Sequence, residues 1–447
     1  MKLVHLVPAL KAGGAIQALR GLMNRLDDMQ HTVLALDGAV RGDVLVSLLR
    51  TGARVLRAPD HVQVRDAVDA ADVVLVHYYN HPLLLRLLAA GLTQARWVVW
   101  YQVLGRGLPQ VFYPDRLDEG VWCVFTAAPQ KTWGRPGPVI PGMVDSAFFD
   151  LARVPHAGLV IDYIGSANVA KLHPGSIRFL SPLQGEGLRI RFHGGPLGDA
   201  MREDLARAAN ARCFEIGGFA QDVPGLLATS DIFITPMAPE SYASSDLSLQ
   251  EAMHAGLPSV VLGENGSADM ITHGHDGLVV QTGAAFTAAL QRLCDDAALR
   301  HRLGQAARAT AVSRFDPVRN AARMRDVLAA RAKTPRSDFG FASKPDLKPA
   351  VVYLMSQGWV EAGAVAAVSG WSAGRRSDLE RFAIGLSKVG AQVEGGLIHW
   401  RNTFPDDVVL RWMTGVWMHA AGDNETAKAE FAAAGEPDAT AGGGQHR

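Results

Sequence analysis

Residues 230–280 read SDIFITPMAPESYASSDLSLQEAMHAGLPSVVLGENGSADMITHGHDGLVV, and this stretch determines the fold. A strand-like apolar run is followed by a polar loop, an amphipathic helix and a second apolar run. Near-continuous apolar strands separated by helices are typical of a parallel sheet whose two faces are covered by helices. Ligands bind such sheets beyond the carboxyl ends of the strands, so we expect a binding site in the loop before Leu247.

The same alternation extends in both directions and predicts two α/β domains. Strands are expected at residues 3–7, 32–36, 72–76 and 97–100 in the first half, and at 159–164, 189–192, 232–234 and 259–262 in the second. We therefore predict two Rossmann-like, doubly wound domains over residues 1–150 and 151–332. A long polar helix over residues 317–333 is expected to close the second domain.

The remainder of the chain has a different composition. Residues 333–349 are rich in Pro, Lys, Ser and Asp and are predicted to form a linker. Residues 350–436 are predicted to be a helical extension, and residues 437–447 a flexible tail. Within the extension, residues 412–434 fit one helix–turn–helix unit whose small and aromatic positions match part of a tetratricopeptide repeat. A plain helical cap remains the alternative.

Charge and cysteine content exclude several classes of protein. The 447 residues contain 44 Lys plus Arg and 44 Asp plus Glu, so the chain lacks the basic excess that drives non-specific binding of nucleic acid. Its 3 cysteines are far apart and form no Cys-x-x-Cys pair, which argues against a disulfide framework and a zinc cluster. No apolar run reaches the roughly 20 residues that a membrane span requires.

The loop before Leu247 leads directly into a helix. The N-terminus of a helix presents free backbone N–H groups and a positive partial charge, so this corner is a candidate phosphate site. Ser248 and Glu251 also fit the Ser-x-x-Glu capping box, in which both side chains close their own helix. On the residues alone, the capping box is the preferred interpretation.

The arrangement resembles the second domain of GT-B glycosyltransferases, in particular the retaining family 4. The motif of that family is two glutamates separated by seven residues and followed by Ala-Met-x-x-Gly-x-Pro; here Glu251 is followed by AMHAGLP. Residues 194–196, 218–223, 230–236 and 268–280 resemble further segments of the family, as do, more thinly, Gly13-Gly14 and the IPGMVD run at 140–145. The resemblance implies two domains that face each other across a cleft.

The resemblance also implies the residues of a donor site. They are Gly13, Gly14, Ser166, Lys171, Phe219, Asp246, Leu247, Ser248 and Glu251. Lys171 and Glu251 are the predicted catalytic residues: Glu251 would bind the ribose hydroxyls, and Lys171 would neutralise the diphosphate held by the backbone at residues 246–248. Phe219 would lie near the base. The resemblance implies neither a metal ion nor any other cofactor.

The chain departs from the family pattern at three places. Ala243 stands where the first glutamate is expected, Ser166 where an arginine is usual, and residues 100–102 read Trp-Tyr-Gln where a histidine is usual. His77 and His81 are four residues apart, but no glutamate follows His77, so we expect a loop lining the acceptor cleft rather than a zinc site.

Two functions from different classes follow. The first is a glycosyltransferase that moves a sugar from a nucleotide-diphosphate sugar to a glycan or lipid-linked acceptor, with retention and without a metal ion. The alternative is a catalytically weak GT-B-like scaffold that recruits a protein partner through its C-terminal helices. A nucleotide-sugar epimerase on the same fold is a third and less favoured hypothesis, because the residues around Glu251 resemble the transferases more closely. Because the N-terminus does not resemble a secretory signal and no apolar run is long enough to span a membrane, we expect a cytoplasmic protein, with peripheral contact at the inner face of the membrane as a further hypothesis. What the family commonly does implies a role in polysaccharide biosynthesis.

Overall fold

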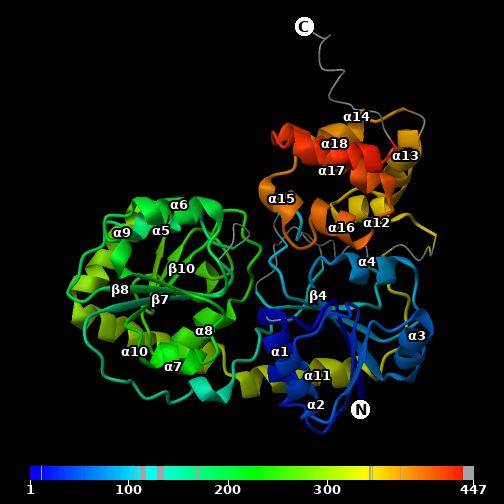
Figure 1. Ribbon diagram of the computed structural model, residues 1–447. Helices are drawn as coiled ribbons and strands as arrows, with labels where there is room; N and C mark the ends of the chain where they lie inside the picture. The colour runs from blue at the N-terminus through cyan, green and yellow to red at the C-terminus, as the bar shows by residue number, and fades with distance from the viewer. Residues whose placement is uncertain are drawn as a thin grey trace.

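The computed structural model describes the chain except for residues 12, 106, 111–116, 128–134, 168–170, 342–343, 345, 373 and 436–447. The tail predicted at 437–447 therefore lies outside the described residues. Figure 1 shows two α/β lobes side by side, with a layer of helices on top of the N-terminal lobe.

The N-terminal lobe is a parallel six-stranded sheet in the order β3-β2-β1-β4-β5-β6. Its strands are β1 (Lys2–Val7), β2 (Gln30–Ala35), β3 (Arg54–Arg57), β4 (Val73–Tyr78), β5 (Trp97–Tyr101) and β6 (Trp122–Phe125). Its helices are α1 (Gly14–Met23), α2 (Gly42–Leu49), α3 (His61–Ala70) and α4 (Pro82–Ala89). The central strand β4 is buried along its whole length, as expected for a sheet covered on both faces.

The C-terminal lobe repeats this plan, with the strand order β12-β11-β10-β7-β8-β9. Its strands are β7 (Val160–Ile164), β8 (Arg189–His193), β9 (Phe214–Gly217), β10 (Ile232–Pro236), β11 (Ser259–Leu262) and β12 (Leu278–Val280). Its helices are α5 (Ser176–Leu180), α6 (Asp199–Arg207), α7 (Val223–Ala228), α8 (Leu247–His254), α9 (Gly283–Asp295) and α10 (Ala297–Arg314). Short 3-10 helices lie at Ser146–Phe148, Ala211–Cys213 and Ala268–Met270.

Helix α11 (Pro317–Arg331) does not close the second domain as predicted, because it crosses back to the first (Figure 1). Arg331 is 1% exposed, and its Nε donates a hydrogen bond to the carbonyl of Trp97 in β5 at 3.3 Å. Met324 and Leu328 belong to one apolar cluster with Trp100 of the first sheet. The amphipathic pattern predicted that this helix has a buried face, but not which sheet covers it.

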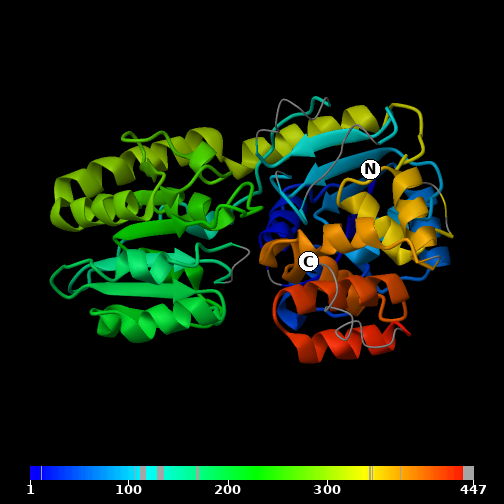
Figure 2. The ribbon, with the colours of Figure 1, turned by 90° about the horizontal axis from the view of Figure 1, so that it is seen from above.

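The predicted helical extension is present and packs on the N-terminal lobe (Figure 2). It comprises α12 (Pro349–Ser356), α13 (Glu361–Ser372), α14 (Ser377–Ile384), α15 (Lys388–Gln392), α16 (Leu397–Thr403), α17 (Val408–Ala420) and α18 (Asn424–Ala433). Helices α12 and α16 contact α4, so the extension and the N-terminal lobe share one apolar core.

The extension ends in a helical hairpin, and the segment before it runs along the first sheet. Helices α17 and α18 form the predicted helical hairpin, in which a Cβ added at Gly415 would lie 2.8 Å from the ring of Phe431. Within the predicted linker, Ser337 pairs with Ala95 as an antiparallel β-bridge, so this part of the segment runs along the first sheet. Among the described residues, no helix has the length and apolar character needed to cross a membrane.

Candidate active site

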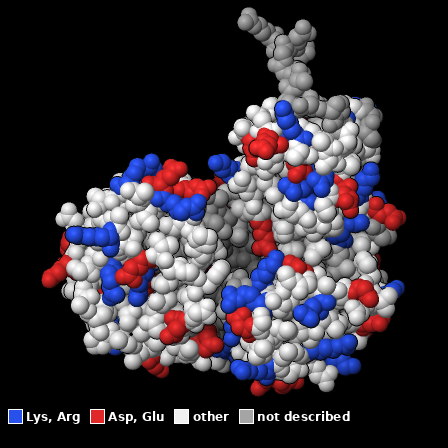
Figure 3. All heavy atoms as spheres, in the orientation of Figure 1, with Lys and Arg blue, Asp and Glu red and all other residues white. Residues whose placement is uncertain are grey.

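A cleft of about 480 Å³ lies between the two lobes. Figure 3 shows the hollow, with acidic and basic side chains gathered at its edge. The structure brings all of the predicted donor-site residues to its walls: Gly13, Gly14, Ser166, Lys171, Phe219, Asp246, Leu247, Ser248 and Glu251. They come from the loops that follow β1, β7, β9 and β10 and from the first turns of α1 and α8, at the carboxyl ends of both parallel sheets.

The start of α8 is an uncapped helix N-terminus. Asp246 occupies the N-cap position, but its side chain accepts no hydrogen bond from a backbone N–H of the first turn. Its Oδ1 instead accepts from the hydroxyl of Ser248 at 2.7 Å and lies 3.5 Å from Nζ of Lys171. The first backbone N–H groups of α8 are therefore left to a ligand, as an anion site requires.

The preferred capping-box interpretation is therefore wrong. Ser248 lies inside the first turn of α8 rather than at its N-cap, so it is not in position to close the helix. The helix begins two residues earlier than the box requires, because Asp246 is the residue with extended backbone.

Glu251 lines the cleft one turn further along α8. Burial raises the pKa of its carboxyl to about 8; the charges of Asp246 and Asp145 add to this effect, and Lys171 opposes it. A protonated carboxyl offers one hydrogen-bond donor in addition to its acceptors, which suits a hydroxyl-bearing ligand.

The first domain supplies a second helix N-terminus to the cleft. Gly13 is the N-cap of α1 and has no side chain to bond the first turn. Gly14 lies close to the start of α8, since a Cβ added there would be 3.9 Å from Cδ1 of Leu247. Leu247 also packs against Gly142 and belongs to an apolar cluster that joins the two lobes.

Phe219 and Ser166 lie on other parts of the wall. Phe219 is 60% exposed, and the guanidinium of Arg41 from the opposite lobe is 5.9 Å from its ring centroid. An exposed aromatic ring at the cleft is suited to stacking on a planar base. The backbone carbonyl of Ser166 accepts a hydrogen bond from the hydroxyl of Tyr163, and its side chain brings no charge to the cleft.

Two of the three departures from the family pattern lie side by side across the domain boundary. Ala243 forms a β-bridge with Val103, next to the Trp-Tyr-Gln run. The hydroxyl of Ser244 donates to the carbonyl of Gln102 at 3.0 Å. Trp100 itself is buried, and its indole N–H donates to the carbonyl of Ile140, so this ring supports the core rather than the cleft.

The two histidines of the HYYNH stretch have different environments. His77 is buried in β4, where its ring nitrogen lies 3.0 Å from that of His5, so it does not belong to a loop lining the cleft as predicted. Tyr79, between them, does line the cleft. His81 is the N-cap residue of α4 and lies near Glu394 and His399 of the extension.

The sequence did not indicate Lys11 and Glu394, which also line the cleft. Lys11 follows β1 and forms an ion pair with Asp37 at 2.9 Å. Glu394 comes from the turn between α15 and α16, far from the matched motifs. The glycine pair that follows it, Gly395-Gly396, is the only local signal that this turn approaches another backbone closely.

Comparison with known proteins agrees with this arrangement. Residues 165–296 match the family described as "Glycosyl transferases group 1". Over 112 residues the chain is 29% identical to the UDP-Gal:alpha-D-GlcNAc-diphosphoundecaprenol alpha-1,3-galactosyltransferase of Escherichia coli. That segment is 25% of this chain and spans only 28% of the length of this curated relative.

Solved structures resemble the two-lobed part. Anabaena HepE in complex with UDP-glucose matches with a TM-score of 0.60 at 17% identity, covering 74% of this chain and 100% of that one. A glycosyltransferase from Rickettsia africae matches with a TM-score of 0.62 at 14% identity, covering 75% and 99%. WaaG, a glycosyltransferase of lipopolysaccharide biosynthesis, matches with a TM-score of 0.55 at 14% identity, covering 73% and 99%.

The fold is therefore that of the GT-B glycosyltransferases, with a C-terminal helical region added. Within that class, the match of residues 165–296 confirms the resemblance to the group 1 glycosyltransferases.

Proposed function

We propose that this protein is a glycosyltransferase that moves a sugar from a nucleotide-diphosphate sugar to a hydroxyl group of a glycan or lipid-linked acceptor. The observation that carries this proposal is the uncapped start of α8 beside Lys171 and Glu251 in the cleft between the lobes. The proposed reaction requires no metal ion and no organic cofactor.

The residues of the cleft suggest how the donor would be held. The N–H groups of α8 would bind the diphosphate, and Lys171 would turn from Asp246 towards it, because a lysine is a compact point charge on a flexible stem. Glu251 would hydrogen-bond the ribose hydroxyls, and Phe219 would lie against the base. Binding of the leaving diphosphate by preorganised donors lowers the barrier to its departure.

We further propose retention of the anomeric configuration. In a same-face displacement, the bond between the anomeric carbon and the phosphate oxygen breaks while the acceptor oxygen attacks from the same side, and the departing phosphate takes the proton of the acceptor hydroxyl. Ala243 favours this same-face route over a double displacement, because it puts an inert methyl group where a nucleophilic carboxylate would be needed to form a glycosyl-enzyme intermediate.

The relatives indicate the substrate class to test first. The solved Anabaena structure contains UDP-glucose, and the name of the Escherichia coli relative gives a UDP-sugar donor and a lipid-diphosphate-linked acceptor. We propose UDP-sugars as donors and lipid-linked sugars as acceptors for this chain. Such acceptors would bring the protein to a membrane surface without a spanning helix.

A scaffold of low catalytic activity is the second candidate function. The absence of side-chain charge at Ala243 and Ser166 favours it, and the helical extension offers a surface for a protein partner.

The experiment is a calorimetric titration with UDP-glucose, GDP-mannose and ADP-glucose, followed by assays of donor hydrolysis and of transfer, with and without EDTA. The proposal expects binding of at least one donor and turnover that EDTA does not abolish. Binding without turnover, even with lipid-linked sugars present, would favour the scaffold. Failure to bind any of the donors would contradict both the transferase and its donor site.

A further inference from the structure

The helical extension reaches into the cleft through one turn. Glu394 lies between α15 and α16 and lines the same cleft as Lys171 and Glu251. The side chain of Gln110 holds this turn on the N-terminal lobe, because its Nε2 donates to the carbonyl of Glu394 at 2.6 Å and to that of Asn80 at 3.2 Å. The backbone position of Glu394 is therefore fixed by residues of the glycosyltransferase fold.

Gly395 makes this close approach possible. Its φ is +84°, and a Cβ added there would lie 2.6 Å from the carbonyl oxygen of Asn80. The extension also bonds the other lobe, since the hydroxyl of Ser387 donates to the carboxylate of Glu240 at 2.6 Å. The extension that carries Glu394 is thus attached on both sides of the cleft, to the N-terminal lobe through this turn and to the C-terminal lobe through the start of α15.

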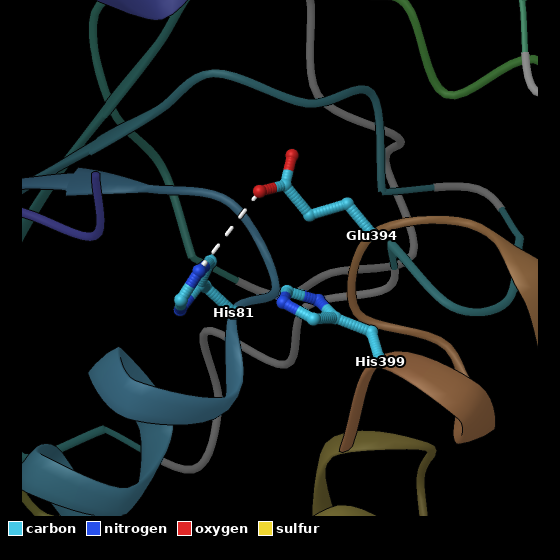
Figure 4. A group of neighbouring side chains, drawn as sticks. All are labelled: His81, Glu394 and His399. Atoms are coloured by element: carbon cyan, nitrogen blue, oxygen red, sulfur yellow. Dashed lines mark ion pairs between the residues drawn. The ribbon is translucent and has the colours of Figure 1, made fainter. Parts of the chain in front are cut away.

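The carboxylate of Glu394 is 40% exposed and faces several polar groups. Figure 4 shows it beside His81 and His399, with Nε2 of His81 3.9 Å from its Oε1. Its charge also contributes to raising the pKa of Tyr242 to about 12, although burial is the larger cause. Tyr242 is the neighbour of Ala243, and both line the cleft together with Glu394. Glu394 therefore brings a carboxylate to the part of the cleft where Ala243 provides none.

These three side chains lie close enough to suggest a metal site, but the hydrogen bonds of the histidines argue against one. Nδ1 of His399 accepts from the backbone N–H of Gly395 at 2.9 Å, and Nδ1 of His81 accepts from that of Leu83 at 3.3 Å. A neutral imidazole that accepts at Nδ1 carries its proton on Nε2, where a metal ion would need a lone pair. Nε2 of His81, which is buried and without a hydrogen-bond partner among the described residues, is therefore an N–H donor.

We infer that Glu394 accepts hydrogen bonds from pyranose hydroxyl groups bound in the cleft, so that the helical extension completes the sugar-binding part of the active site. A carboxylate bordered by N–H donors matches a sugar hydroxyl, which both donates and accepts. The hydroxyls belong either to the sugar of the donor or to the sugar of the acceptor. This inference rests on the proposed function, and the experiment below separates the failure of each.

The experiment compares the wild-type chain with Glu394→Gln, and with Glu380→Gln as a control at an exposed position of the same extension. Calorimetry measures the affinity for UDP and for UDP-glucose, UDP-galactose and UDP-N-acetylglucosamine. Saturation-transfer NMR with UDP present measures binding of the methyl α-glycosides of glucose, galactose and N-acetylglucosamine. Circular dichroism and the melting temperature check that each variant is folded.

We expect Glu394→Gln to bind UDP within twofold of the wild type. If Glu394 binds the donor sugar, the variant binds the UDP-sugar that the wild type prefers at least fivefold more weakly. If Glu394 binds the acceptor sugar, the variant binds the glycoside that the wild type prefers at least fivefold more weakly. A folded variant unchanged in both measurements overturns the inference and leaves the proposed function intact. Calorimetry with zinc chloride tests the metal site directly, and stoichiometric zinc binding that Glu394→Gln abolishes would also overturn the inference. A wild-type chain that binds none of these UDP-sugars, and neither GDP-mannose nor ADP-glucose, contradicts the proposed function and this inference with it.

Discussion

Nζ of Lys171 lies 3.5 Å from Oδ1 of the buried Asp246, and in the proposed mechanism the lysine turns from this carboxylate to the diphosphate. We predict that Lys171→Met weakens UDP binding 10- to 100-fold, because a hydrogen bond to a charged group contributes about 1.5–3 kcal/mol. Isothermal titration measures the loss, with the exposed Lys333→Met as the control. A folded Lys171→Met variant with unchanged affinity for UDP would assign the lysine to Asp246 alone.

Glu251 leads to a prediction about stability and pH. Its folded-state pKa of about 8 lies above the usual 4.5, so between these values the native state retains a proton that the unfolded chain releases. The contribution of Glu251 to stability is therefore complete below pH 4.5 and is lost as the pH rises towards 8, by about 1.4 kcal/mol per pH unit.

Glu251→Gln removes this titration. From pH 5.5 to 7.5 the stability of the variant relative to the wild type should increase by roughly 2–3 kcal/mol, as measured by urea unfolding. The exposed Glu425→Gln should show no such increase. Parallel pH profiles for the wild type and Glu251→Gln would mean that the carboxyl of Glu251 is ionised throughout this range.

At the scale of elements, three adjacent strands of the first sheet are joined by a buried chain of histidines. His5 of β1 lies between His77 of β4 and His31 of β2, with ring nitrogens 3.0 Å and 2.9 Å apart. Burial lowers the pKa of His77 to about 3, and it lowers those of His5 and His31 as well. These rings are therefore neutral in the folded protein.

Because His77 takes up a proton near pH 6.5 in the unfolded chain but only near pH 3 in the folded protein, the protein should lose stability as the pH falls below 6.5. We predict that His77→Gln, whatever its cost at pH 7.5, loses less stability than the wild type between pH 6.5 and 5, by up to about 1.4 kcal/mol per pH unit. Urea unfolding at several pH values measures this. The exposed His275→Gln should keep the wild-type slope, and an equal slope in His77→Gln would show that this ring is protonated in the native state.

The turn that holds Glu394 can be tested through Gly395. We predict that Gly395→Ala lowers the melting temperature more than Gly422→Ala does, by about 2 kcal/mol in equivalent free energy. Both glycines have a left-handed φ, +84° and +87°, but an added Cβ meets the Asn80 carbonyl only at Gly395 and nothing within 4 Å at Gly422. Equal effects would mean that the turn yields to the added methyl group.

At the scale of the whole molecule, the sequence predicted where strands and helices lie along the chain better than it predicted which elements pack against each other. Strands such as β7 and β10 were predictable because their apolar runs end at polar loops, and the order of matches placed Lys171 and Glu251 on one cleft. The packing of α11 on the first sheet was not predictable, since an amphipathic helix specifies a buried face and not the surface that covers it. The position of Glu394 was not predictable for a similar reason: the residue that holds its backbone at the cleft is Gln110, which is 284 residues away along the chain.

The shared core of the extension and the N-terminal lobe leads to the last prediction. Val352 and Leu354 of α12 are fully buried in the same apolar cluster as Leu84 and Leu88 of α4. Each large apolar side chain buried there contributes about 1.5–3 kcal/mol, so a chain ending at Lys348 would expose much of α4 to water. We predict that this truncation unfolds at a melting temperature at least 10 °C lower than the full chain, or aggregates during purification. The matched control ends at residue 435 and removes only the final 12 residues. A truncation at Lys348 that stays monomeric, melts with the full chain and binds UDP normally would show instead that the extension is an independent module, because its core would not be needed by the two lobes.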